Sequence, residues 1–130
     1  MPGYDLVVQA MSGLMSLTGD ADGPAYRASI AVFDVMTGLR ATVGILAALH
    51  QREQTGEGQH VEVNLMSSAL SGLVNHTAAY TAAGVVPARM GNNHPSVYPY
   101  EPLPTADRDT IIAAAGDPAV PCAVRGARDR

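Results

Sequence analysis

Asp34 is the residue of this chain best placed for chemistry. It lies between a short apolar run, residues 30–33, and a long amphipathic stretch that continues to His50. The pattern predicts an extended approach over Ser29–Phe33 and then a helix, with Asp34 at its first position. Free backbone N–H groups and the positive end of the helix dipole stabilise a carboxylate there. Such a carboxylate either caps the helix or, in a pocket that takes a reactive acyl group, attacks as a nucleophile.

The histidines and the cysteine do not suggest a metal centre. His50, His60, His76 and His94 share no ligand spacing such as H-x-x-x-H or H-E-x-x-H. Cys122 is the single cysteine, so neither a disulfide framework nor a cysteine-based metal site is expected. We therefore expect no bound metal.

Hydrophobic periodicity predicts the elements that position Asp34. Tyr4–Leu17 is a short apolar segment, predicted to be helical toward its end, and Val35–Glu53 has a broad apolar face at helical spacing. We interpret Thr55–Gln59 as a tight turn, because a phosphate loop follows a strand and precedes a helix. Beyond it the pattern predicts, in order, a strand over Gln59–Leu65, a helix over Met66–Ala83 closed by Gly84, a long loop over Val85–Thr105 and a short strand over Thr110–Ala115.

Several motifs occur in the order seen in one enzyme family. They are Pro2–Gly13, Ala31–Leu39, Gly44–Leu49, and Arg52 with Thr55–Gln59. Together they resemble the class III CoA-transferases, which include formyl-CoA transferase, the carnitine CoA-transferases and the acyl-CoA racemases. The resemblance runs from Pro2 to about Gly116. It implies an α/β fold, in which this chain is an internal fragment covering the end of a Rossmann-like large domain and the start of a small domain.

The resemblance also implies a reaction. Asp34 matches the family's Asp that attacks an acyl-CoA, which gives an aspartyl mixed anhydride, then an aspartyl-CoA thioester, and finally CoA transfer to a second carboxylic acid. Coenzyme A thioester is then a substrate, and no permanently bound cofactor is expected. Gln9 and Ser12 either line the channel for the thioester or lie on an ordinary helix surface. The resemblance further implies an interlocked homodimer.

A polar segment in the predicted loop is the second candidate site. It contains Gly91, Asn92, Asn93, His94 and Tyr98. In the family this region lies near the active site, so these residues are candidates to bind the acyl carboxylate. The alternative is a linker held by Asn side chains and prolines.

Two alternatives to the transferase remain open. Racemases of the family carry a His where this chain has Tyr4, and they use it with the helix-start Asp for proton exchange at carbon. Tyr titrates near pH ~10, which makes it a poor substitute for His, so Tyr4 favours the transferase branch. The other alternative is a catalytically inactive truncated product.

Composition and charge fit part of a cytoplasmic enzyme. Apolar residues make up 47% of the 130 residues, the net charge is −4, and the longest apolar run is expected to be too short and interrupted to cross a bilayer. We expect neither a nucleic-acid nor a membrane partner. The predicted domains are a partial large domain, 1–84, a linker with the start of the small domain, 85–117, and a tail, 118–130. The tail has no apolar period, and we interpret it as an out-of-frame reading or a disordered terminus.

Overall fold

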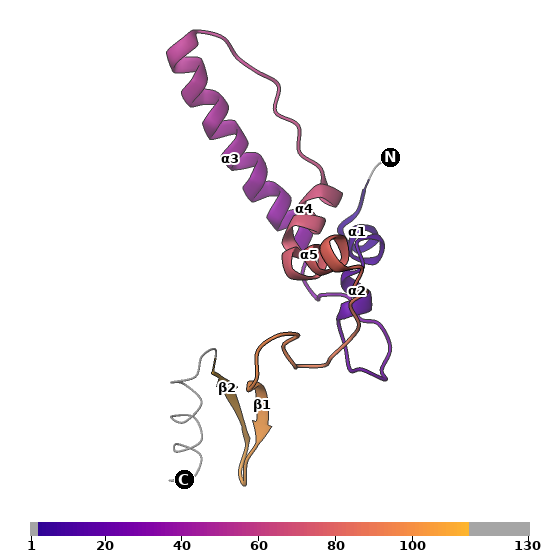
Figure 1. Cartoon of the computed structure of the whole chain (residues 1–130). Coiled ribbons are helices and arrows are strands. Elements are labelled where there is room, and N and C mark those ends of the chain that lie inside the picture. Colours follow the sequence, from indigo (N-terminus) through magenta and orange to yellow (C-terminus); the bar gives the residue numbers. More distant parts are fainter. Residues whose placement is uncertain (1–2, 115–130) are drawn as a thin grey trace.

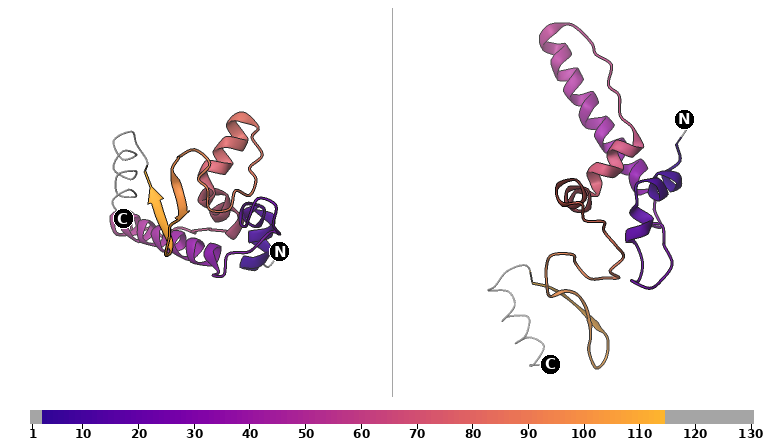
Figure 2. Two further views of the ribbon diagram at one scale, coloured as in Figure 1. Left: turned by 90° about the horizontal axis from the view of Figure 1, so that it is seen from below. Right: turned by 45° about the vertical axis from the view of Figure 1, so that its right-hand side comes forward.

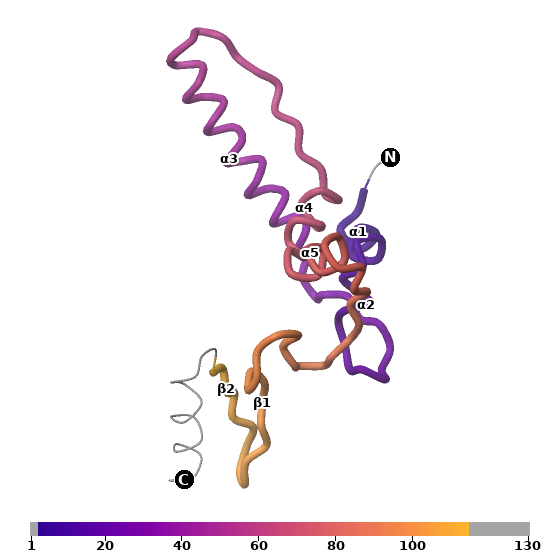
Figure 3. The backbone as a smooth tube through the Cα atoms, in the orientation of Figure 1, coloured from indigo at the N-terminus to yellow at the C-terminus, as the bar shows by residue number. Residues whose placement is uncertain are grey.

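The computed structural model describes residues 3–114, which form helices followed by a β-hairpin (Figure 1). The elements are α1 (Asp5–Met11), α2 (Leu14–Leu17), α3 (Val32–Thr55), α4 (Leu65–Gly72), α5 (Val74–Ala83), β1 (Tyr100–Pro104) and β2 (Asp109–Ala113). The shorter helices gather at the N-terminal end of α3, while the rest of α3 extends away from them, as the tube in Figure 3 shows. The hairpin stands apart from the helices (Figure 2, right).

A small apolar core lies where α1, α3 and α4 meet. Val8, Phe33 and Ala69 are buried there, one from each helix. Half-buried side chains that pack against them are Leu14, Val32, Met36 and Leu65. Gly72 lets the end of α4 approach α3 closely, since a Cβ at this position would lie 2.5 Å from the Met36 side chain. The core therefore fixes the first turn of α3, which carries Asp34.

Helix α3 is longer at both ends than the predicted Val35–Glu53. It ends at Thr55, and the next residue, Gly56, has a left-handed backbone (φ 77°) and donates its N–H to the Arg52 carbonyl. Its apolar face is exposed in this chain, and α3 is long and apolar enough by length and composition to cross a membrane. The expectation that no apolar run reaches that length is wrong for α3, although core helices of soluble proteins meet the same test.

The predicted strand over Gln59–Leu65 is absent. Residues 57–64 instead run without regular structure back along α3 (Figure 3). A strand needs a neighbouring strand for its backbone hydrogen bonds, and none pairs with this segment in the described part of the chain. Val61 lies against Gly44 of α3, where a Cβ would approach the valine methyl to 2.8 Å.

The predicted helix Met66–Ala83 is two helices. Leu73 interrupts it with a backbone outside the helical region (φ −83°, ψ 29°), so that α4 ends and α5 begins there. Asn64 caps α4 by accepting the Ser67 N–H at 2.8 Å. Gly84 closes α5 in the left-handed conformation (φ 66°), which confirms its predicted position.

The long loop predicted over Val85–Thr105 contains a strand. β1 pairs antiparallel with β2, and Tyr100 lies opposite Ala113. Three prolines over residues 99–104 concealed β1 in the sequence, because proline is tolerated only in edge strands such as this one. The strand predicted over Thr110–Ala115 corresponds to β2. The tail, 118–130, lies outside the described residues.

Candidate active site

Asp34 occupies the third position of α3, not the first. The helix begins at Val32, and Ala31 stands at the N-cap position without a side chain that can accept a hydrogen bond. The predicted extended approach over Ser29–Phe33 is wrong, because residues 29 and 30 form a bend and Val32 and Phe33 already belong to the first turn of the helix. Asp34 itself is exposed in this chain. No hydrogen bond of its carboxylate is present among residues 3–114, so this carboxylate does not cap the helix.

Asp5 of α1 caps α3 instead. Its Oδ1 accepts the backbone N–H of Phe33 at 2.7 Å and of Asp34 at 3.3 Å. These are the second and third helical residues, the two N–H groups that an N-cap side chain ordinarily takes. Asp5 is buried, at 8% exposure. The start of α3 is thus held by a carboxylate from another helix.

Gln9 completes this junction. It is fully buried on α1, one turn after Asp5. Its Nε2 donates to Asp5 Oδ2 and, at 3.2 Å, to the Ile30 carbonyl, while its Oε1 accepts the Ala28 N–H at 2.8 Å. The amide therefore ties α1 to the segment that leads into α3, and all three contacts lie within the chain.

Two further residues belong to the surroundings of Asp34. Tyr4 is exposed and directly precedes Asp5, so position 4 lies at the same junction as the start of α3. Arg40, about two turns after Asp34, donates from Nη1 to the Ser67 carbonyl at 3.1 Å and links α3 to α4. Tyr4 and Arg40 therefore lie beside the two helices, α1 and α4, that flank the start of α3.

The predicted segment around Gly91 docks on a different part of the chain. Gly91 donates its N–H to the Gly19 carbonyl at 3.1 Å, and Arg89 Nε donates to the Asp20 carbonyl at 3.3 Å. Gly91 has a left-handed backbone (φ 62°), a conformation that glycine adopts readily. Gly19 and Asp20 open the loop that leads to α3, so Gly91 reaches Asp34 only indirectly.

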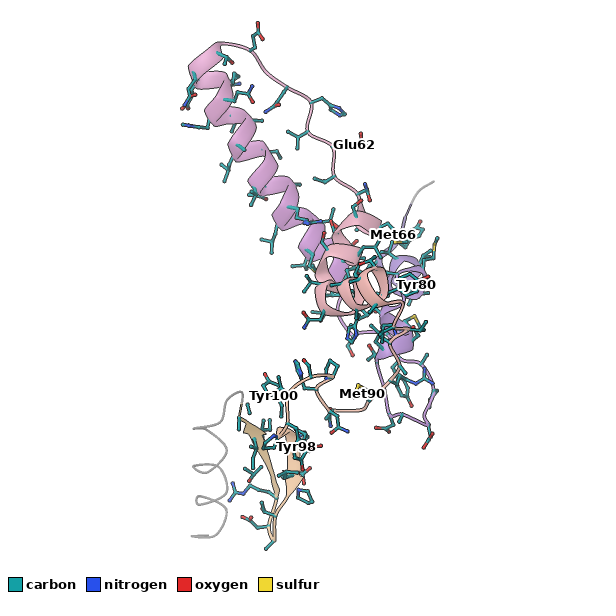
Figure 4. All side chains as sticks on the ribbon, viewed as in Figure 1. Glu62, Met66, Tyr80, Met90, Tyr98 and Tyr100 are labelled. Atoms are coloured by element: carbon teal, nitrogen blue, oxygen red, sulfur yellow. The ribbon has the colours of Figure 1, made fainter. Side chains whose placement is uncertain are left out.

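The remaining predicted site residues lie between this docking point and the hairpin. Asn92 is exposed, and the Asn93 N–H bonds the Met90 carbonyl at 3.1 Å within the turn. His94 Nδ1 accepts the Ser96 N–H at 3.2 Å, and its ring lies 5.1 Å from that of Tyr100. Tyr98 is 80% exposed beside the hairpin (Figure 4). No hydrogen bond in the described part of the chain joins these residues to Asp34.

A groove on α3 lies at its other end. It lies between the end of α3 and the segment 57–64 that runs back along this helix. Its lining residues are Ile45, Ala48, Leu49, Arg52 and residues 58–61. Fifteen helical residues separate Asp34 from Leu49, which corresponds to roughly 20 Å along the axis. This groove is therefore separate from the helix start. Among residues 3–114, no three His, Cys, Asp or Glu side chains gather as a metal site would require.

Sequence reasoning missed Asp5 as a member of this site. The available signal was the spacing of Asp5 and Gln9, four residues apart and therefore on one face of a helix that also carries Val8. Two polar side chains beside an apolar one on the same face indicate a buried hydrogen-bonded pair rather than a solvated surface.

Comparison with known proteins shows the family to which this chain belongs. The model of CoA-transferase family III matches residues 1–129. The chain belongs to this family. Helices α1 and α3, with Asp5, Gln9 and Asp34, lie within the matched residues, and the match confirms the family that the sequence motifs resemble.

Named relatives of this family III chain are CoA-transferases. The succinate–glutarate CoA-transferase of Agrobacterium fabrum is 44% identical over 115 residues, which cover 88% of this chain and 29% of that protein. The succinyl-CoA:mesaconate CoA-transferase of Haloarcula hispanica is 41% identical, with 89% and 29% covered. The chain thus spans less than a third of these relatives.

Solved structures share the fold. A CaiB/BaiF family protein from Brucella suis is 40% identical with a TM-score of 0.76, over 89% of this chain and 31% of that one. A hypothetical protein from Mycobacterium tuberculosis has a TM-score of 0.77 at 24% identity, over 99% of this chain and 34% of that one, which supports the fold alone. The described helices and hairpin are therefore an α/β fragment of the CaiB/BaiF fold, as predicted.

Proposed function

We propose that this chain supplies the catalytic carboxylate of a CoA-transferase that acts through covalent intermediates on Asp34. The observation that carries the proposal is that Asp5, and not Asp34, accepts the backbone N–H groups at the start of α3. Asp5 caps the helix, so the Asp34 carboxylate is exposed beside the helix N-terminus without a partner among the described residues. A carboxylate whose backbone is fixed and whose oxygens are not engaged by other groups is suited to act as a nucleophile.

The proposed reaction begins with acylation of Asp34. One carboxylate oxygen attacks the thioester carbon of the acyl-CoA; a C–O bond forms, the C–S bond breaks, and CoA thiolate leaves. The thiolate then attacks the aspartyl carbonyl of the mixed anhydride and releases the donor acid as its carboxylate, which leaves aspartyl-CoA thioester.

The second half repeats these steps with the acceptor. The acceptor carboxylate attacks the aspartyl thioester and releases CoA thiolate, which gives a new mixed anhydride. The thiolate then attacks the acceptor's acyl carbon, so that acceptor-CoA leaves and the Asp34 carboxylate is restored. Electron pairs balance over the cycle, and neither a metal nor a redox partner is consumed.

For substrates we propose a succinyl-CoA donor and a small dicarboxylic acid as acceptor. The names of several relatives support this choice, because they pair succinyl groups with glutarate, mesaconate or citramalate. The polar segment with Gly91, Asn92, Asn93, His94 and Tyr98 is proposed to bind the acceptor in the intact enzyme. We propose a cytoplasmic homodimer in which protein rather than lipid covers α3.

Racemase chemistry is the second candidate, and the residue at position 4 argues against it. Tyr4 directly precedes the Asp5 that holds the Asp34 amide, and by the resemblance it matches the position at which racemases of the family carry a His. Proton exchange at carbon calls for a side chain of a type that titrates near neutral pH, as histidine does. For this chain taken alone, the main alternative to the proposed function is a catalytically inactive truncated product.

The test uses a complete enzyme in which residues 3–114 replace the matching segment of the Agrobacterium fabrum succinate–glutarate CoA-transferase (the chimera). Asp34→Asn should lower transfer from succinyl-CoA to glutarate on the order of 10³-fold or more. Helix α3 should remain formed, since Asp5 provides its cap, and circular dichroism checks this. Asp22→Asn, in an exposed turn, is the matched control. Turnover by Asp34→Asn within tenfold of the parent would refute the assignment.

A further inference from the structure

Asp5 is a buried carboxylate without a cationic partner. Among residues 3–114, the one ion pair joins Asp107 and Arg108, far along the chain from Asp5. Three donors converge on Asp5 instead: the Gln9 amide and the N–H groups of Phe33 and Asp34. Burial of a carboxylate costs free energy that only such hydrogen bonds and the helix dipole offset.

A local cap would avoid this penalty. Ser, Thr, Asn or Asp at position 31 could cap α3 from solvent, yet the chain has Ala31 there. Capping from α1 does something a local cap cannot, because it fixes the Asp34 backbone to a second helix. It also occupies two N–H groups that would otherwise attract the Asp34 carboxylate back onto the helix end.

We propose that Asp5, oriented by Gln9, is a positioning residue for the reaction at Asp34. This inference rests on the proposed function. By holding the Asp34 N–H, Asp5 sets where the Asp34 side chain leaves the helix and keeps its carboxylate available to the thioester. Displacement of a reacting group by about 1 Å costs up to roughly 100-fold in rate.

The role of Gln9 follows from its fixed amide. Its Oε1 accepts from Ala28 and its Nε2 donates to Ile30, so the Nε2 must also face Asp5. In Asp5→Asn the new amide nitrogen faces that donor, and the network breaks. A second change, Gln9→Glu, supplies an acceptor to the new amide and keeps the Ala28 contact while losing the one to Ile30, and should restore most of the arrangement.

The experiment compares three variants of the chimera: Asp5→Asn, Asp5→Asn with Gln9→Glu, and Asp22→Asn. Asp5→Asn should lower kcat for succinyl transfer by about 10- to 100-fold, with KM for succinyl-CoA within threefold of the parent. Amide hydrogen exchange in the peptide spanning residues 31–36 should quicken at the same time. The double variant should recover at least a third of the lost kcat on a logarithmic scale, and Asp22→Asn should match the parent.

The following outcomes would contradict the proposed roles of Asp5 and Gln9. Parental kcat in Asp5→Asn removes the role of Asp5, and so does a lowered kcat with unchanged exchange over residues 31–36. Failure of the double variant to recover activity refutes the Gln9 pairing. If the parent chimera itself transfers no CoA, the proposed function fails and the role of Asp5 in catalysis falls with it, whereas the exchange comparison still shows whether Asp5 orders the helix start.

Discussion

At the scale of single residues, the residue that caps α3 and the proposed nucleophile are two different aspartates, Asp5 and Asp34. The helix pattern predicted a carboxylate at the start of α3 and left capping and nucleophilic attack open for Asp34. The structure gives the cap to Asp5, whose contacts with Phe33 and Asp34 span 28 and 29 residues of sequence. Local pattern can indicate the Asp5–Gln9 pair on α1 but not its contacts with α3, because it relates only neighbours three or four residues apart.

Gln9 offers a test of how much this junction contributes to stability. Gln9→Leu should lower the free energy of unfolding of the chimera by about 2–4 kcal/mol, because Asp5, Ala28 and Ile30 each lose a buried hydrogen-bond partner. Urea denaturation measures the change. Gln54→Leu, at an exposed amide of α3, should change stability by less than about 0.5 kcal/mol. Equal effects of the two variants would show that the buried network adds nothing.

At the scale of elements, sequence periodicity predicted the helices, but it did not predict the helix break and the unpaired segment, which depend on contacts between distant residues. Helix α3 and the glycine that closes α5 were predicted from spacing and residue type. The break at Leu73 was missed. It directly follows Gly72, which lies against Met36 of α3, a tertiary contact that spacing along the sequence does not report. The segment 57–64 has the alternation of a strand, but pairing requires a neighbour, which this part of the chain does not provide.

Gly44 reports on the packing of that segment against α3. An alanine in a helix normally gains roughly 0.5–1 kcal/mol over glycine, but its Cβ at position 44 would lie 2.8 Å from a Val61 methyl. Gly44→Ala should therefore destabilise the chimera by about 1–2 kcal/mol. Gly58→Ala, with no atom within 4 Å, should be near neutral. Thermal melting of both variants measures the two changes in stability. A rise in melting temperature for Gly44→Ala would contradict the observed contact.

At the scale of the whole molecule, the chain exposes more surface than its mass warrants. Its accessible area is 9647 Å², whereas a compact monomer of 13.5 kDa exposes roughly 6,500 Å². Exposed apolar side chains lie along α3, among them Val35, Leu39, Val43 and Leu46. The sequence predicted this broad apolar face from its helical spacing, and an apolar face of this size is normally covered by other protein. The interlocked homodimer remains a proposal.

The isolated 130-residue chain should accordingly behave as an incomplete domain. We expect it to associate in a concentration-dependent way and to bind an anilinonaphthalene sulfonate dye strongly, because the apolar face of α3 lacks a cover. The complete chimera should bind little of this dye. A monodisperse monomer with sharp cooperative melting, seen by analytical ultracentrifugation and calorimetry, would contradict this expectation.

In the proposed reaction Asp34 carries the acyl group as a mixed anhydride and then CoA as a thioester. The most direct measurement adds hydroxylamine to the chimera during turnover of succinyl-CoA and maps the modified residue by peptide mass spectrometry. An aspartyl anhydride or thioester at Asp34 should give a hydroxamate on that side chain, dependent on succinyl-CoA, and none on Asp5 or Asp22. Full transfer activity with no label at Asp34, or with the label on another residue, would contradict the proposed covalent role of Asp34.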